Sequence, residues 1–182
     1  MATLLYSDCP GCGVHLPMLE AYSDKRYNAS AECWQLYGEL GAYTVTRGDN
    51  ALIHQLAVDA YGAQHTGENV RPITVAFALI GVYFACEQGY SGRQVQHMHM
   101  LLAQRSKTWP QFAPPPHAGA MTVLDVVQAR PGEERDAMLR QWGRSVWDAW
   151  SQDHDRVTSL VEASGFGTQP GVARVCPAVA PA

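Results

Sequence analysis

Apolar residues recur at helical spacing along most of this chain. From about residue 30 onward they repeat every three or four positions, which is the spacing of one buried face of an α-helix. Glycine, proline and capping residues separate these stretches and indicate where helices begin and end. The pattern predicts helices that begin near Ser30, Leu52, Pro72, Ser91, Thr122 and Pro131.

One stretch, from Ile73 to Cys86, is almost wholly apolar. It is too long for one strand and too short to span a membrane, so it predicts a central buried helix that begins at Pro72. No segment alternates polar and apolar residues with a period of two, and no Gly-rich phosphate loop is present. The predicted fold class is therefore all-α, a bundle of about five helices around the buried one.

The predicted domain organisation is simple. Residues 1–163 read as a single helical domain, and their first part, residues 1–29, is an irregular segment that carries two cysteines. Residues 164–182 hold Gly, Pro, Ala and Val without any period, so we expect a flexible C-terminal tail. A chain of 182 residues is long enough to bury a sizeable core, so a bound metal need not be its main source of stability.

Composition narrows the setting and the partners. The net charge is −4 and the chain has only two lysines, whereas a nucleic-acid surface clusters Lys and Arg, so nucleic acid is a poor candidate. No apolar run reaches about 18 residues, so we expect no membrane span. The first six residues lack a basic start and a long apolar run. We therefore expect a cytoplasmic protein with reduced thiols.

The clearest chemical signal is the string Cys9-Pro10-Gly11-Cys12-Gly13. Two thiols two residues apart on a tight turn can face one zinc ion, which makes this string half of a typical zinc site. A thioredoxin-like redox pair is a second interpretation, but the expected strand before it and helix after it are missing. Two reduced cysteines without a ligand are the third.

Cys33 is the natural third zinc ligand, because it lies in the first turn of the helix that Ser30 is expected to cap. A buried free cysteine is the alternative. The fourth position falls to His65, at the end of its helix, or to His54. Eleven residues of helix place these two histidines about 16 Å apart, so one unbroken helix cannot supply both to one ion. We prefer His65, and His54 stays open.

The second predicted helix carries several polar residues beside its apolar face. A candidate pocket lies where its end meets the N-terminal segment, lined by Tyr27, His54, Asp59, Tyr61 and Gln64. The alternative is that these side chains satisfy buried backbone groups around the metal. Asp59 lies about 9 Å before His65 along the helix and on another face, so we do not expect it to bind the ion. We expect its carboxylate to cap a neighbouring loop or to hold Tyr61, Arg26 or Arg71 by a charged hydrogen bond. His97 and His99 point in different directions on a helix and cannot chelate together.

Four strings resemble a bacterial family of uncharacterised proteins. They are residues 9–13, residues 30–34, residues 58–67 and the segment 145–150, and together they span nearly the whole domain. The run Asp-x-Tyr-x-x-Gln-His-x-Gly within residues 59–67 is the most distinctive of them. Members of that family usually carry Pro where this chain has Thr66, which implies a less rigid turn here. No activity is assigned to the family, so the resemblance supports the choice of residues and names no reaction.

Two functional classes follow. The first is a zinc-stabilised helical protein that works as a binding module for a small molecule or a protein. The alternative is a metal-dependent enzyme of helical-bundle type, a hydrolase or thiol transferase, whose ion keeps one position open. The number of protein ligands separates them, because four ligands close a zinc site and three leave room for substrate. Catalytic residues cannot be assigned from the sequence.

Overall fold

A computed structural model describes residues 5–19, 23–105 and 108–166. These residues form seven α-helices, one short 3₁₀ turn and one two-stranded sheet. In chain order the elements are β1 (Tyr6–Asp8), β2 (His15–Pro17), α1 (Ala31–Thr46), α2 (His54–Gln64), α3 (Pro72–Cys86), α4 (Gly92–Arg105), α5 (Val123–Gln128), α6 (Glu133–Ala149), η1 (Ser151–Asp153) and α7 (His154–Ala163).

The predicted helix starts agree with the structure to within two residues. The hydroxyl of Ser30 accepts the Cys33 N–H at 3.3 Å and caps α1. Thr122 opens α5 with a capping box, in which the Asp125 carboxylate accepts the Thr122 N–H at 2.7 Å. The described residues form one helix more than the six predicted starts. The helix predicted to begin near Pro131 ends at Ala149 and is followed by η1 and then α7, a break that apolar spacing does not reveal.

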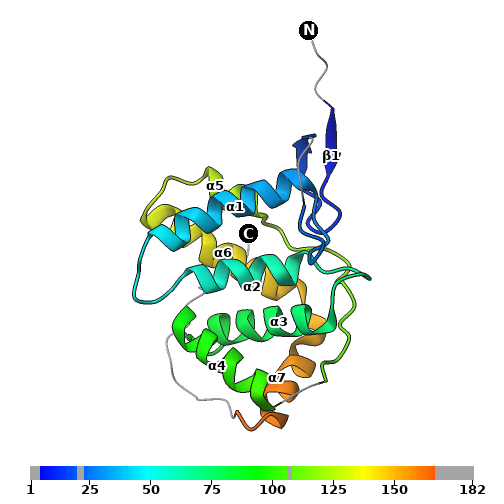
Figure 1. The fold of residues 1–182 in the computed structure, drawn as a ribbon, viewed down its shortest axis with the longest axis vertical. Helices are drawn as coiled ribbons and strands as arrows, with labels where there is room; N and C mark the ends of the chain where they lie inside the picture. The colour runs from blue at the N-terminus through cyan, green and yellow to red at the C-terminus, as the bar shows by residue number, and fades with distance from the viewer. Residues whose placement is uncertain (1–4, 20–22, 106–107, 167–182) are drawn as a thin grey trace.

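Residues 6–17 of the N-terminal segment form a β-hairpin, which corrects the prediction of an irregular segment. β1 and β2 pair antiparallel, with Ser7 opposite Leu16. Strands of three residues are too short to show alternation in a sequence, so this sheet left no signal. Figure 1 shows the hairpin in blue above the bundle, beside the ends of α1 and α2.

The apolar helix α3 lies in the core, as predicted. It packs against α2, α4, α6 and α7, and most of its residues are buried. Gly62 brings α2 close to α3, because a Cβ there would lie 3.0 Å from the Cβ of Ala78. In the described residues, no helix combines the length and apolar character that crossing a membrane requires.

Three tryptophans of α6 and its C-terminal end complete this core. Trp142, Trp147 and Trp150 are each at most 1% exposed. Every indole N–H donates a hydrogen bond, for example from Trp142 to the Gln64 side-chain oxygen at 3.0 Å. Buried residues from Cys9 to Val161 form one continuous cluster, so the hairpin packs against the same core as the helices. The predicted C-terminal tail lies almost wholly outside the described residues.

Candidate metal centre

The first two cysteines lie at the turn of the hairpin. The Cys9 N–H donates to the Val14 carbonyl at 2.9 Å, and the Gly13 N–H donates to the Cys9 carbonyl at 2.8 Å. Gly13 has a φ of +73°, a conformation that glycine adopts without strain. The turn is therefore fixed by backbone hydrogen bonds, and it brings Cys9 and Cys12 to the end of the hairpin that faces α1 and α2.

The third cysteine stands in the first turn of α1. The Ser30 N–H at the start of this helix donates to the Cys9 sulfur at 3.4 Å. The sulfurs of Cys12 and Cys33 lie 3.8 Å apart. The start of α1 therefore places Cys33 beside both cysteines of the hairpin turn.

His65 follows the last residue of α2, and its ring orientation is defined. Its Nδ1 lies 2.9 Å from the Tyr61 carbonyl oxygen. A carbonyl can only accept, so Nδ1 carries the proton and Nε2 keeps its lone pair. Nε2 lies 3.2 Å from the Cys33 sulfur. A hydrogen bond from the second ring nitrogen to a carbonyl is the usual support of a metal-bound histidine.

Together these side chains form one compact cluster. One donor atom from each of Cys9, Cys12, Cys33 and His65 lies within 4.8 Å of every other. Two sulfurs bound at about 2.3 Å to one tetrahedral zinc ion would lie about 3.8 Å apart. The Cys12–Cys33 separation equals that value. Cys33 and His65 are 0% exposed and Cys9 is 2% exposed, so the donors face each other inside the protein.

The thiols influence one another's protonation. Hydrogen bonds from the Cys12 and Cys33 thiols lower the pKa of Cys9. Hydrogen bonding to Cys12 and Cys9, together with burial, raises the pKa of Cys33. The side chains alone therefore favour one thiolate among neutral thiols. A divalent cation supplies the charge that holds further thiolates together in a buried place.

Asn28 ties the loops around this cluster together, and the sequence did not single it out. Its N–H donates to the His65 carbonyl at 2.8 Å, and its side-chain amide donates to the Thr66 carbonyl at 3.2 Å. The same amide reaches the Pro10 carbonyl at 3.4 Å. At Gly67, a Cβ would lie 3.0 Å from the Asn28 side chain, which explains the glycine that follows the histidine motif.

Gly11 is the second residue whose role the sequence did not reveal. A Cβ there would collide with the Asn28 carbonyl and lie 2.8 Å from the His65 ring. The cysteine turn therefore packs directly onto the end of α2. Gly11 stands within the cysteine string, but only the fold shows which residues pack against it.

The alternative histidine lies elsewhere. The Nδ1 of His54, at the start of α2, is 2.8 Å from the Thr44 hydroxyl of α1. Burial lowers the pKa of His54 and favours its neutral form. His54 is not part of the cysteine cluster, so its contact with Thr44 joins two helices and leaves His65 as the histidine that accompanies the three cysteines.

Two residues of the expected pocket, Tyr61 and Gln64, are buried by their contacts with other described residues. Tyr61 is 0% exposed and stacks on Tyr37 and on His65. Gln64 donates to two carbonyl oxygens at 2.7 Å, those of residues 118 and 121, and accepts from Trp142. Gln64 therefore bonds buried polar groups, and Tyr61 packs between two aromatic rings.

Tyr27 and Asp59, the next two residues of the expected pocket, lie beside a cavity. Both line a small cavity of about 230 Å³ between α2, α3 and α4. Asp59 stays outside the cysteine cluster, as predicted. The expected partners of its carboxylate were a neighbouring loop, Tyr61, Arg26 or Arg71, and the structure shows a different one. The Gln55 amide, one turn earlier on α2, lies 3.0 Å from both oxygens.

One protein family, described as a family of unknown function (DUF5946), matches residues 7–151. The chain belongs to this family. The match contains all four residues of the cluster and most of the helical core. No curated protein and no solved structure shows a significant match to the chain.

Proposed function

We propose that Cys9, Cys12, Cys33 and His65 hold one structural zinc ion, and that the chain works as a zinc-stabilised helical binding module. The observation that carries this proposal is the convergence of four buried donor atoms within 4.8 Å. Four protein ligands complete the tetrahedral shell that zinc adopts in structural sites.

The donor chemistry supports zinc among the common ions. Three thiolates and one imidazole form one of the usual structural zinc sets. Mg²⁺ and Ca²⁺ prefer oxygen donors, and this cluster offers none. The protonated Nδ1 of His65, held by the Tyr61 carbonyl, leaves Nε2 as the donor that zinc would bind.

The same geometry favours a structural ion over the alternative, a metal-dependent enzyme. A catalytic zinc ion keeps one position for water or substrate. Here the fourth donor is His65, which is fully buried beneath Tyr61. An ion in this place would fasten the hairpin to the start of α1 and to the end of α2. Its effect would be to stabilise these loops against the bundle.

Metal analysis of the purified protein tests the proposal. Protein prepared without chelator should carry one zinc per chain, and Cys9→Ser or Cys12→Ser should each lose it. Cys86→Ala is the matched control, because Cys86 is equally buried but lies in α3, outside the cluster. A preparation without stoichiometric metal would refute the proposal.

Cobalt substitution separates a structural ion from a catalytic one. The Co²⁺ form should show the absorption of a tetrahedral thiolate site, and added azide or a small thiol should leave that spectrum unchanged. A spectral change on adding azide would indicate an open position and support the enzyme.

A further inference from the structure

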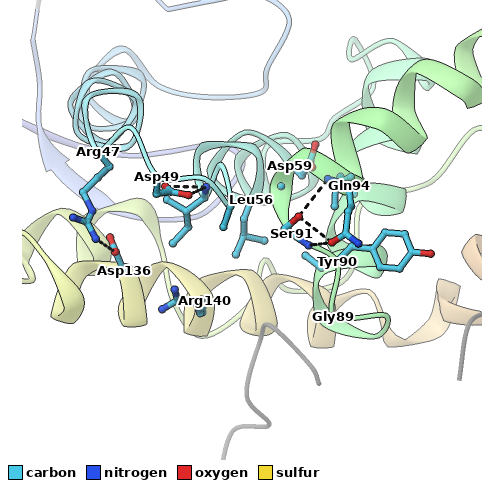
Figure 2. A pocket seen from close by; sticks show the side chains of 16 residues that line it. Arg47, Asp49, Leu56, Asp59, Gly89, Tyr90, Ser91, Gln94, Asp136 and Arg140 are labelled. Carbon is cyan, nitrogen blue, oxygen red and sulfur yellow. Dashed lines mark hydrogen bonds and ion pairs between the residues drawn. The ribbon is translucent and has the colours of Figure 1, made fainter. Parts of the chain in front are cut away.

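A second site lies away from the cysteines, on another face of α2. It is a cavity of about 460 Å³ between α2, α3, the start of α4 and α6. This volume suits a small organic molecule, since ligand pockets usually measure about 300–1,000 Å³. Apolar side chains form much of its wall, among them Ile53, Leu56 and Val95. Figure 2 shows the polar residues that stand around this wall.

Arg140 of α6 provides a positive charge at one side of the cavity. Its side chain is partly buried, and it makes no hydrogen bond or ion pair with any residue in the described part of the chain. Neighbouring Arg47 is different, because its guanidinium contacts the Asp136 carboxylate at 2.6 Å. An unpaired guanidinium that lines a cavity is a ready partner for a carboxylate, which it can bind through two parallel hydrogen bonds.

Asp59 provides the polar group at the other side. It is 4% exposed, and in Figure 2 it stands well apart from Arg140, with Leu56 between them in this view. Gly81 leaves room for its carboxyl group, because a Cβ at that position would collide with it. Burial raises the pKa of Asp59 well above its usual value and favours the protonated acid. A protonated carboxyl group has an O–H to donate, in addition to the oxygens that face Gln55.

The remaining charges of the cavity have partners. Asp136 faces Arg47 and also accepts from the Tyr43 hydroxyl at 2.6 Å. Asp49 accepts the Ile53 N–H at 3.3 Å, near the positive end of α2. Arg140 is therefore the group that an anionic ligand would meet without displacing an existing ion pair.

We propose that this cavity binds a small organic carboxylate with an apolar body, whose carboxylate pairs with Arg140 and whose far end carries a hydroxyl or carbonyl oxygen that meets Asp59. The inference rests on the proposal that the chain is a binding module, and it does not depend on which metal the cysteines hold. The apolar wall between the two polar groups selects a ligand with a hydrocarbon chain between its ends.

Calorimetric titration with two probes tests the inference. The probes are hexanoate and ω-hydroxyhexanoate, which differ only in the terminal oxygen. The wild-type protein should bind the hydroxy acid more tightly, because only this acid can accept from Asp59. Arg140→Gln should weaken its binding by about tenfold or more, the usual effect of losing a charged hydrogen bond.

Matched variants exclude unspecific effects. Arg130→Gln also removes one positive charge, but Arg130 is exposed, pairs with Glu134 and lies outside the cavity, so its affinity should equal that of the wild type. Asp59→Leu should abolish the preference for the hydroxy acid and keep the contribution of Arg140. If Asp59→Leu does not fold, the comparison of the two probes on wild-type protein still tests the role of Asp59.

The outcomes are distinct. Absence of binding at millimolar probe, equal affinity for both probes, or an Arg140→Gln variant that binds like the wild type would each overturn the inference. A zinc-loaded protein that binds neither probe would refute this inference and leave the structural zinc proposal intact. A protein that binds the hydroxy acid but contains no metal would refute the structural zinc proposal and support this inference.

Discussion

The imidazole of His65 is held twice by Tyr61. Its Nδ1 donates to the Tyr61 carbonyl oxygen at 2.9 Å, and the two rings stack with their centroids 3.9 Å apart. The hydrogen bond fixes which nitrogen is protonated, and the stack fixes the plane of the ring. The spacing of four residues between them is one helical turn, so α2 itself aims the fourth donor of the cluster at Cys33.

Zinc binding should survive when His65 is replaced by another metal-binding side chain, but not when it is replaced by an apolar one. His65→Ala should lose zinc and lower the melting temperature, because a buried ion would keep only three protein ligands. His65→Cys should keep much of the zinc, since four thiolates also form a stable site. Metal content and thermal melts of both variants measure this.

The control for this pair is His54→Ala. It removes the contact with Thr44 but no donor of the cluster, so zinc should remain stoichiometric. Zinc loss in His54→Ala, with retention in His65→Ala, would exchange the roles of the two histidines.

Gly11 should tolerate no side chain, although it lies in a turn. Gly11→Ala would press a methyl group onto the Asn28 carbonyl and the His65 ring. We expect a loss of about 1–3 kcal/mol from overpacking, together with weaker zinc binding. Gly38→Ala is the matched control, because Gly38 lies in the exposed middle of α1 with open space around it. That change should raise stability by about 0.5–1 kcal/mol. Equal melting temperatures for the two variants would contradict the packing.

Gln64 should be a structural residue. Gln64→Ala would leave two buried carbonyl groups and the Trp142 N–H without their partner. We expect the free energy of unfolding to fall by at least about 2 kcal/mol, with zinc content unchanged. Gln96→Ala, on the exposed face of α4, should stay within about 0.5 kcal/mol of the wild type. Denaturant unfolding of both variants measures the difference.

Much of the helical fold was predictable because the residues that end and begin helices have local effects. Ser30, Pro72 and Thr122 act within one turn of their own position, so sequence alone locates the helices that they begin. The hairpin was not predictable, because its strands are short and are held by the turn between the cysteines.

The candidate metal centre was predictable in part for the same reason. Cys9 and Cys12 share a turn, and Cys33 sits a fixed distance behind the cap of α1. The choice between His54 and His65 depended on where α2 ends against the hairpin, which is a tertiary relationship. Asn28 gave no local signal, because it acquires its role from a segment far away in the chain.

His99 should make the protein less stable in mild acid. Its ring packs on Phe77 with centroids 5.0 Å apart, and its Nε2 is buried without a hydrogen-bond partner among the described residues. Burial lowers the pKa of His99 from 6.5 to about 4. Between these pH values His99 is protonated in the unfolded chain but stays neutral in the folded protein. The free energy of unfolding therefore falls as the pH falls from 6.5 towards 4. We expect a loss of about 2 kcal/mol from this residue.

His99→Phe should remove that loss, because phenylalanine keeps an aromatic ring beside Phe77 and binds no proton. Asp59 and Tyr27 line the same small cavity and are left in place, so their titration is common to both proteins. His97→Phe is the control, since His97 is exposed two residues earlier on α4 and should leave the wild-type profile unchanged. Urea unfolding at pH 7, 5.5 and 4.5 measures all three. If the wild type and His99→Phe lose stability in parallel over this pH range, the prediction that His99 stays neutral in the folded protein is refuted.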